Sequence, residues 1–427
     1  MTSRRSSLEG IGNTLIADVF GRPTEDRLLD VYIHLERYVN DGSPSGFSTG
    51  VPAEFSPLSP RESFELPVYL LPRSALVQVG ILDYSWAAAV SAEQLPLPLH
   101  PVVVGEVLRM FPFIEGLPRL MLPVIPTASA RTVLVRSEKD RPHFIKLHYP
   151  YELGRFPRDL CLYKWLAALE NSRELDAHTA RFPTFFAFLP ESGGVFLPDR
   201  APRSGVGAIF REFIPRPERQ IATLLVPAFS LFAGCVPPAH GRPLLIQILE
   251  MLSDRSTETE SFMSHFVLPA LEVFAFLALD LGLIPEMHAQ NVLFEVDPAL
   301  KKTRLIIRDL GDLFKDYVVR RERNLHTSFC SYKSIDPRID SDLFQRRSFA
   351  FDFKFSHYLL LPLGQCFAVA TGRVLESVLE RIREACRIVM LQRAPDYFAS
   401  PNLWYRYPKQ RNVGRRAYQE QTAPLFR

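Results

Sequence analysis

The chain has 427 residues, enough for two or three domains of about 150 residues each. Its hydrophobic fraction of 47% and charged fraction of 23% are typical of a chain that buries a core, which excludes wholesale disorder. Lys and Arg number 50 against 47 Asp and Glu, a net charge of +3. This balance gives no support for a nucleic-acid partner.

The sequence also indicates a compartment. Its five cysteines are widely separated and show neither CxxC nor zinc-type spacing, so we expect free thiols in a reducing environment. The polar N-terminus has no apolar signal region. Two apolar stretches, 221–238 and 266–285, contain prolines or carboxylates, which favours core helices over membrane spans. The sequence thus predicts a cytoplasmic protein that does not contact a membrane.

The first element in chain order is a helix over residues 28–39, and a loop rich in Gly, Ser and Pro follows over 41–60. Strands broken by a turn at 72–74 are predicted over 67–84, and a short helix over 103–110. A proline-rich passage, 112–126, follows, and we place a domain boundary there. The predicted domains are an N-terminal domain, 1–126, and a C-terminal domain, 127–427, which ends in a basic tail.

The C-terminal domain is predicted to combine hairpins with helices. Apolar segments rich in β-branched and aromatic residues predict three hairpins, formed by 132–136 with 143–148, 194–198 with 207–214, and 291–296 with 304–309. Helices are expected over 157–170 and over most of 221–281, and after the third hairpin the remaining chain is expected to be helical to about 391. Because no βαβ alternation occurs, the predicted class is α+β, with antiparallel sheets and flanking helices.

A first group of polar residues lies at the first hairpin of this domain. Ser129, Arg131 and Thr132 come directly before or at the start of its first strand, Lys146 lies in its second strand, and Arg158 follows twelve residues later. A planar Arg fork beside a Lys point charge suits a triphosphate. The alternative is a solvated hairpin with surface ion pairs, since exposed Lys and Arg are common.

A second group flanks the third hairpin. The segment 286–291 (EMHAQN) follows a long apolar helix and precedes a strand, and Asp309 follows the next strand. His288 can bind or relay a proton at a phosphate or carboxylate oxygen near neutral pH. Asn291 and Asp309 offer the hard oxygen ligands that Mg²⁺ takes when it bridges phosphates. The alternative is a hydrogen-bonded turn with a core histidine.

The tail, residues 401–427, is strongly basic. It holds six Lys and Arg residues against one Glu. Such a tail is usually a solvated surface. The alternative is that Lys409 returns to the site and binds a substrate carboxylate.

The order of these motifs, SxRT, K-x11-R, ExHxQN and RDxG, resembles the IucA/IucC-like, NRPS-independent siderophore synthetases over residues 97–427. The resemblance implies a cupped, hand-like architecture of fingers, palm and thumb. Residues 1–126 would form a shortened fingers- or thumb-like part, and 127–427 the catalytic palm-like part. The family's HPxHPxxK element, which helps to hold the acid substrate, has no counterpart here, so no particular acid is assigned.

The resemblance also implies a reaction and residue roles. The reaction is ATP-dependent adenylation of a carboxylic acid and its condensation with an amine or alcohol, and homodimers are common in such families. The implied ATP contacts are Ser129, Arg131, Thr132, Lys146, Asn291 and Asp309, the last two also holding Mg²⁺, and the implied catalytic residues are His288, Arg158 and Lys409. Two alternatives stay open: an inactive relative that serves as a partner or scaffold subunit, and an ATP-dependent phosphotransferase.

Overall fold

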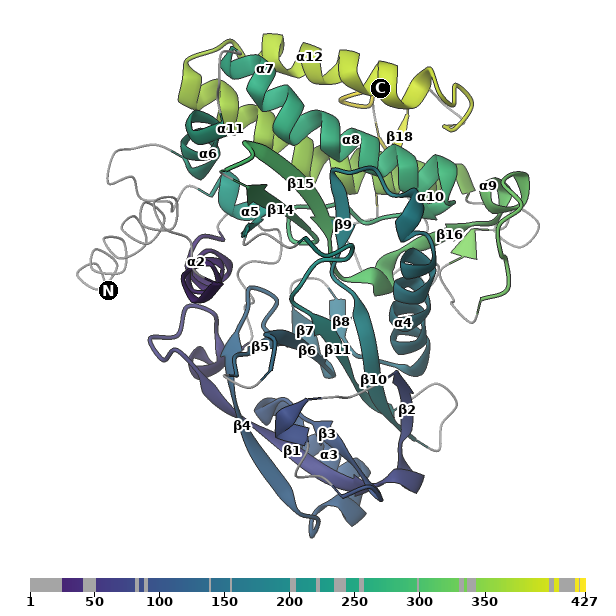
Figure 1. The fold of residues 1–427 in the computed structure, drawn as a ribbon. Helices are drawn as coiled ribbons and strands as arrows, with labels where there is room; N and C mark the ends of the chain where they lie inside the picture. Colours follow the sequence, from purple (N-terminus) through teal and green to yellow (C-terminus); the bar gives the residue numbers. More distant parts are fainter. Residues whose placement is uncertain are drawn as a thin grey trace.

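Most of the chain is described by the computed structural model. The described residues are 25–40, 51–80, 84–87, 91–137, 140–153, 156–199, 205–219, 223–233, 243–252, 257–297, 299–329, 334–335, 343–398, 403–406, 419–421 and 423–427. Helices gather at one end of the molecule and the largest sheet curls at the other, with a smaller sheet between them (Figure 1). The chain is therefore α+β, as its sequence predicts.

The largest sheet has eight strands, and every neighbouring pair is antiparallel. Its order is β2-β10-β11-β6-β5-β4-β1-β3. The strands are β1 (Phe64–Pro72), β2 (Val77–Gly80), β3 (Gln94–Pro98), β4 (Arg119–Pro126), β5 (Thr132–Val135), β6 (His143–Leu147), β10 (Glu191–Pro198) and β11 (Gly205–Glu212). The sheet takes strands from both sides of residue 126, and the domain boundary stays a prediction.

Side-chain alternation along β6 decides what each face of this sheet carries. Ile145 and Leu147 point into an apolar core with Val133 of β5, whereas Phe144 and Lys146 lie on the other face. Lys146 is the cross-strand partner of Thr132. The strand period of two therefore places the predicted lysine on the face that turns toward the rest of the molecule.

A four-stranded sheet lies between the large sheet and the helices, in the order β12-β14-β15-β9. Its hairpin β14–β15 is antiparallel, while β9 pairs with β15 in parallel. These strands are β9 (Phe186–Phe188), β12 (Leu224–Pro227), β14 (Val292–Asp297) and β15 (Lys302–Ile307). The smaller sheets contain β7 (Tyr149–Leu153), β8 (Phe156–Arg158), β13 (Leu283–Ile284), β16 (Phe314–Asp316), β17 (Ser334–Ile335), β18 (Trp404–Arg406) and β19 (Gln419–Gln421).

Most helices pack into the largest apolar core, on the far side of the four-stranded sheet (Figure 1). The exceptions are α3, which packs in the core of the large sheet, and α4, which packs mainly against β10 and β11. The helices are α2 (Glu25–Tyr38), α3 (Val104–Met110), α4 (Leu162–Ala177), α5 (Ala228–Leu231), α6 (Leu244–Leu252), α7 (Glu258–Phe262), α8 (Leu268–Ala275), α9 (Tyr317–Glu322), α10 (Leu343–Ser348), α11 (Leu361–Thr371) and α12 (Leu375–Cys386). Segments of π-helix extend four of these helices, at Met263–Val267, Phe276–Asp280, Phe349–Leu360 and Arg387–Leu391.

The three predicted hairpins are confirmed, and three element predictions are corrected. Helix α4 begins at Leu162 and not at 157, because Phe156–Arg158 pairs with β7 and Cys161 is extended. Arg158 therefore ends a strand and does not start a helix. The passage 112–126 contains β4, and Leu224–Pro227 forms a strand with β14 in a segment predicted to be mainly helical.

The two apolar stretches are part of the core. One helical run, Glu258–Asp280, has the length and apolar composition to cross a membrane, but 72% of its most apolar window is buried in the molecule. It packs as a core helix, as expected. The other stretch is buried as β12 and α5 where it is described, so its burial is confirmed, while its helical type is wrong for β12 and right for α5.

The described cysteines, Cys161, Cys366 and Cys386, are free, as expected, while Cys235 and Cys330 lie outside the described residues.

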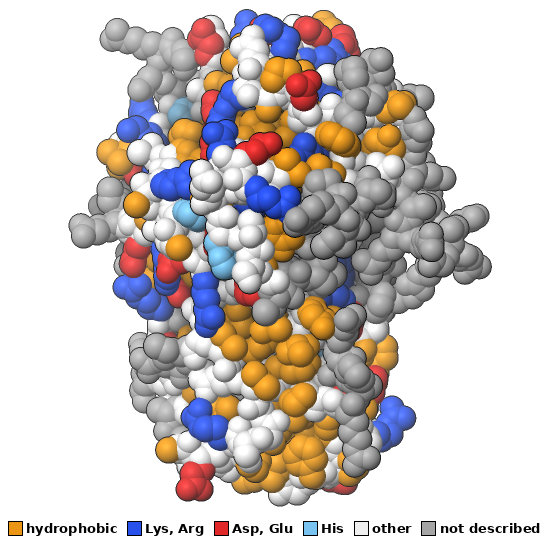
Figure 2. All heavy atoms as spheres, turned by 90° about the vertical axis from the view of Figure 1, so that its right-hand side faces the viewer, with side chains coloured by type: hydrophobic (Ala, Val, Ile, Leu, Met, Phe, Trp, Pro, Cys, Tyr) orange, Lys and Arg blue, Asp and Glu red, His pale blue; other side chains and the backbone are white. Residues whose placement is uncertain are grey.

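The last residue of the basic tail, Arg427, is not part of a solvated surface. Arg427 is 2% exposed and forms an ion pair with Asp352 at 2.9 Å. Over the face drawn in Figure 2, the Lys and Arg side chains alternate with Asp and Glu and do not gather by sign.

Candidate functional site

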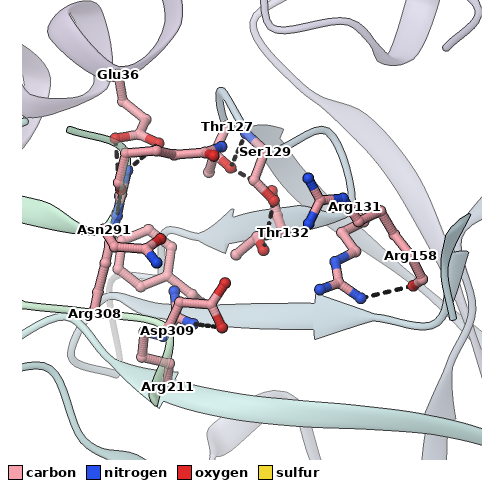
Figure 3. Close-up of a pocket in the computed structure, with 12 residues that line it drawn as sticks. Glu36, Thr127, Ser129, Arg131, Thr132, Arg158, Arg211, Asn291, Arg308 and Asp309 are labelled. Atoms are coloured by element: carbon pink, nitrogen blue, oxygen red, sulfur yellow. Dashed lines mark hydrogen bonds and ion pairs between the residues drawn. The ribbon is translucent and has the colours of Figure 1, made fainter. Parts of the chain in front are cut away.

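A cavity opens where the largest sheet meets the β14–β15 hairpin and helix α2 (Figure 3). It has about 560 Å³ of empty space, counting its mouth to solvent. Its lining residues are Glu36, Thr127, Ser129, Arg131, Thr132, Phe144, Arg158, Arg211, Gln290, Asn291, Arg308 and Asp309. The cavity thus brings together six of the nine predicted site residues: Ser129, Arg131, Thr132, Arg158, Asn291 and Asp309.

A tight turn between β4 and β5 supplies the first of these residues. Thr127 Oγ1 donates to the Thr132 carbonyl at 2.7 Å, and Ser129 Oγ donates to Thr132 Oγ1 at 2.9 Å. Ala130 has a φ of 59°, in the left-handed region that residues with a Cβ rarely adopt. The hydrogen bonds hold this strained turn, and strain of this kind concentrates at functional loops.

The β14–β15 hairpin explains why Asn291 and Asp309 meet. Val292 is the partner of Ile307, so the residue before β14 and the residues after β15 lie at the same edge. The Asn291 side-chain amide donates to the Glu286 carbonyl at 3.1 Å, which fixes its orientation. Asp309 has a φ of 65°, a second left-handed residue at the cavity wall.

Two of the four arginines that line the cavity are neutralised by carboxylates. Arg308 donates to both oxygens of Glu36, at 2.9 and 3.1 Å, and also to Tyr32 Oη at 3.0 Å. Arg211 donates to Glu191 at 2.7 Å and lies 3.7 Å from Asp309. Because carboxylates already balance their charge, these two arginines stabilise the wall of the cavity.

The other two arginines, Arg131 and Arg158, form no ion pair with any carboxylate that the structure describes. They lie across the cavity from Asn291 and Asp309 (Figure 3). Arg131 is 9% exposed and donates to the neutral carbonyl of Arg158 at 2.6 Å. Burial lowers the pKa of Arg131 to about 10, although the charge of Asp309 opposes this shift. A buried cation without its own counter-ion is costly, so this wall is prepared for an anion.

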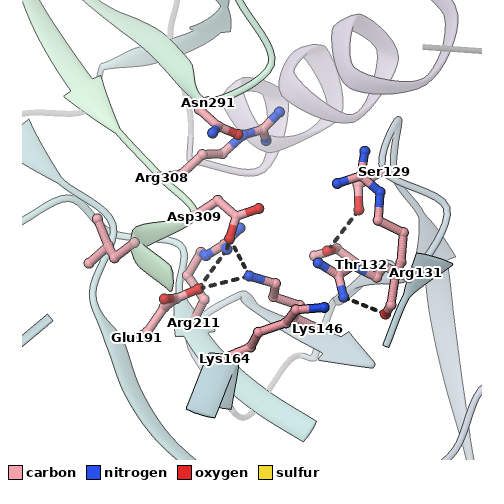
Figure 4. Close-up of polar contacts among 12 residues, drawn as sticks. Ser129, Arg131, Thr132, Lys146, Lys164, Glu191, Arg211, Asn291, Arg308 and Asp309 are labelled. Atoms are coloured by element: carbon pink, nitrogen blue, oxygen red, sulfur yellow. Dashed lines mark hydrogen bonds and ion pairs between the residues drawn. The ribbon is translucent and has the colours of Figure 1, made fainter. Parts of the chain in front are cut away.

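Lys146 is not among the residues that line the cavity, but it contacts Asp309, which is, and its role as an ATP contact stays a prediction. Its ammonium contacts the carboxylate of Asp309 and lies 3.9 Å from Glu191 Oε1 (Figure 4). Together, Lys146, Glu191, Arg211 and Asp309 form a cluster of two cations and two carboxylates, which we call the tetrad. Burial would raise the pKa of Asp309, but Lys146, Arg211 and Arg131 hold it well below its usual value. Asp309 is therefore ionised at neutral pH.

His288 is not among the residues that line the cavity. Its backbone carbonyl accepts from Asn291 at 2.8 Å, so the histidine helps to shape the turn. Burial lowers the pKa of its side chain to about 3, and its Nδ1 has no hydrogen-bond partner within the described part of the chain. The imidazole is thus neutral at pH 7, and its catalytic role stays a prediction. The other predicted catalytic residue, Lys409, lies outside the described residues.

The donor set fits a Mg²⁺ ion that is held mainly by phosphates. Asp309 and Asn291 place a carboxylate and an amide oxygen at the cavity (Figure 3). The described residues contain no group of three His, Cys, Asp or Glu side chains that could cage a metal. Mg²⁺ commonly binds one or two protein oxygens and completes its shell with phosphates and water.

Several cavity residues have little or no signal in the sequence. Glu36 comes from helix α2, more than 270 residues before Arg308, and an isolated Glu in an amphipathic helix is unremarkable. Glu191 lies at the start of β10, before the part of that strand that was predicted. Arg211 lies in β11, a strand that was predicted from its apolar residues. The alternation along β11 could have indicated that Arg211 shares a face with Ile209, but not that this face meets the site.

The fold is that of the IucA/IucC-like synthetases, as comparison with solved structures shows. The chain resembles ATP-bound aerobactin synthetase IucA from a hypervirulent pathotype of Klebsiella pneumoniae, with 17% identity and a TM-score of 0.69, over 99% of this chain and 86% of that chain. It also resembles petrobactin biosynthesis protein AsbB from Bacillus anthracis str. Sterne, with 15% identity and a TM-score of 0.69, over 92% of this chain and 75% of that chain.

A third similar structure is aerobactin synthetase IucC from a hypervirulent pathotype of Klebsiella pneumoniae, with 15% identity and a TM-score of 0.63, over 100% of this chain and 82% of that chain. No protein-family model and no curated protein matches the sequence. At 15–17% identity, these likenesses establish the fold alone, and the fold agrees with the resemblance of the motifs.

Proposed function

We propose that this protein is an ATP-dependent ligase of siderophore-type biosynthesis that activates a carboxylic acid as an acyl adenylate and condenses it with an amine or alcohol. The observation that carries the proposal is the pair Arg131 and Arg158, two cations at the cavity without a carboxylate partner among the described residues. A polyphosphate supplies the missing negative charge. The ATP bound to the similar IucA structure is consistent with this choice.

In the proposed reaction, a carboxylate oxygen of the acid attacks the α-phosphorus of ATP and pyrophosphate leaves. The amine or hydroxyl then attacks the acyl carbonyl and AMP leaves. Arg131 and Arg158 bind phosphate oxygens and stabilise the charge that develops on them. Ser129 and Thr132 present hydroxyl groups on the same wall. No covalent enzyme intermediate is needed, so the residues act by binding and orientation.

Asn291 and Asp309 would hold Mg²⁺, which supplies charge neutralisation of the phosphates when bound. Asp309 is suited to this role because it stays ionised and its side chain is 25% exposed. His288, on the neighbouring turn, would contact a phosphate or carboxylate oxygen, and Lys409 would bind the substrate carboxylate. We further propose that the substrates are small molecules and that the protein works in the cytoplasm.

The direct test is product analysis with purified protein, Mg·ATP and a panel of carboxylic acids and amines. The proposal predicts acid-dependent formation of AMP and pyrophosphate, reduced about 100-fold or more in Arg131→Ala. Arg136→Ala is the matched control, because Arg136 follows the same strand but pairs with Asp30 at the surface. ADP as the product would instead indicate a phosphotransferase, and ATP binding without turnover would favour an inactive relative.

A further inference from the structure

Lys146 is held beside the cavity by two carboxylates. Its side chain is 5% exposed, and its ammonium contacts Asp309 and lies 3.9 Å from Glu191 (Figure 4). Asp309 faces the cavity, whereas the side chain of Glu191 is completely buried. Of the two carboxylates of the tetrad, Glu191 is thus the one that no ligand can contact from the cavity.

Glu191 is firmly held in this position. It begins β10, where its backbone N–H donates to Ser172 Oγ at 2.9 Å and its cross-strand partner is Arg211. Its Oε1 accepts from Arg211 at 2.7 Å and lies 3.9 Å from Lys146 Nζ. Its Oε2 is buried and has no hydrogen-bond partner among the described residues. One oxygen therefore serves both cations, and the carboxylate is fixed by them.

The tetrad is electrically balanced because Glu191 is part of it. Lys146 and Arg211 are cations that an incoming polyphosphate would attract, but each already has a carboxylate neighbour. Negative charge at Glu191 also repels phosphate across a poorly hydrated wall, where charges interact more strongly than in water. A carboxylate in this place lowers the affinity of the cavity for anions.

We propose that Glu191 is a positioning residue that holds Lys146 and Arg211 by its charge and so limits how tightly polyphosphates bind in the cavity. The proposal rests on the function proposed above, since it assumes that the cavity binds ATP. In that reaction, the negative charge of Glu191 opposes the charge of the pyrophosphate and so promotes its release. Its effect is on affinity and release, and Glu191 itself does not touch the substrate.

The test compares Glu191→Gln with the wild-type protein. Glutamine keeps the shape and can still accept from Arg211, but it removes the charge. We expect the Kd values of Mg·ATP and of inorganic pyrophosphate, measured by calorimetry, to fall about tenfold. Pyrophosphate should become a stronger product inhibitor by a similar factor, and kcat should fall while KM for ATP also falls.

Glu295→Gln is the matched control, because Glu295 forms an equally buried pair with Arg304 at 2.6 Å, away from the cavity. It should lower stability without changing either Kd. Glu191→Asp is the second variant: it keeps the negative charge near both cations but, being one methylene shorter, withdraws the carboxylate from Lys146 and Arg211. It should tighten both ligands in the same direction, by a smaller factor.

Unchanged or weaker binding of both ligands in the folded Glu191 variants would overturn the role proposed for Glu191 but not the proposed function. Equal tightening by Glu295→Gln would overturn it too, because the effect would then not be local. A wild-type protein that binds neither Mg·ATP nor pyrophosphate would overturn the proposed function, and this role with it.

Discussion

Arginines of the same cavity have different roles, and their partners distinguish them. Arg308 donates to Glu36, Tyr32 and the Gln290 carbonyl, so it joins three segments of the chain. Among the described residues, Arg131 has a single neutral acceptor, the carbonyl of Arg158, although it is nearly as buried. A buried guanidinium needs a carboxylate, several carbonyl acceptors such as the four that Arg37 has, or a ligand. At the residue scale, the missing partner is therefore a more specific sign of ligand binding than the presence of an arginine.

A buried histidine gives the stability of the protein a pH dependence. His100 is fully buried beside Phe55, Phe64 and Tyr149, and its Nδ1 accepts from the Val102 N–H. Burial lowers its pKa to about 4, so the unfolded chain binds the proton first as the pH falls below the ordinary value of about 6.5. The stabilisation by neutral His100 is complete above that value and is lost as the pH falls toward 4.

We predict that His100→Asn reduces this pH dependence. Its side-chain oxygen can accept the same backbone hydrogen bond but does not titrate. Between pH 7 and pH 5, the free energy of unfolding of the wild type should fall by about 2 kcal/mol more than that of the variant. Urea denaturation at the two pH values measures the difference. Equal losses would contradict the claim that, at pH 5, His100 is neutral in the folded protein but protonated in the unfolded chain.

At the element scale, helix α2 completes the cavity from a distant part of the sequence. Its apolar residues Val31 and Leu35 are fully buried in the core, while Glu36 reaches the cavity and Arg308. Arg308 in turn donates from its backbone to the Asn291 carbonyl at 2.9 Å and directly precedes Asp309. The helix therefore supports the two residues that we expect to hold Mg²⁺.

A double-mutant cycle tests this link. Glu36→Ala leaves Arg308 buried without its counter-ion, which should cost about 3–5 kcal/mol of unfolding free energy. Adding Arg308→Met removes the unpaired charge, so the double variant should lose clearly less than the sum of the two single losses. Chemical denaturation of the four proteins gives the coupling. Additive losses would mean that α2 and Arg308 contribute independently.

Local patterns allowed most elements to be predicted, but not their boundaries. The strand Thr132–Val135 and the hairpin of β14 and β15 follow from apolar and β-branched runs with turn residues between them. The start of α4 was wrong because the pairing of Phe156–Arg158 with β7 is a tertiary interaction that helical spacing does not contain. Strand β4 was missed because its prolines conceal a strand that pairs on both sides.

At the scale of the whole molecule, the cavity joins parts that the sequence separates. The motifs of Arg131 and of Asn291 and Asp309 were predicted from their order, and the structure places them around one cavity. The contributions of Glu36 and Glu191 depend on how sheets and helix pack, so no local pattern contains them. The same packing brings Lys146 against Asp309 and near Glu191, contacts that its motif did not indicate.

Because the cavity lies between the large sheet, the β14–β15 hairpin and α2, ligand binding should stabilise the whole fold. Mg·ATP at 100 times its Kd should add about 2.7 kcal/mol to the free energy of unfolding. We predict a rise in Tm of several degrees with Mg·ATP, smaller at high salt because part of the attraction is screened. Thermal denaturation with and without nucleotide measures it. A salt-independent shift would contradict recognition by the arginines.

The measurement that tests the central claim most directly is calorimetric titration of Mg·ATP into the wild type, Arg131→Ala and Arg136→Ala. If the uncompensated arginines form the polyphosphate site, the wild type and Arg136→Ala bind with similar Kd, while binding to Arg131→Ala is weakened about 100-fold or is not detected. Binding that is equal in all three proteins, or absent from the folded wild type, would contradict the account.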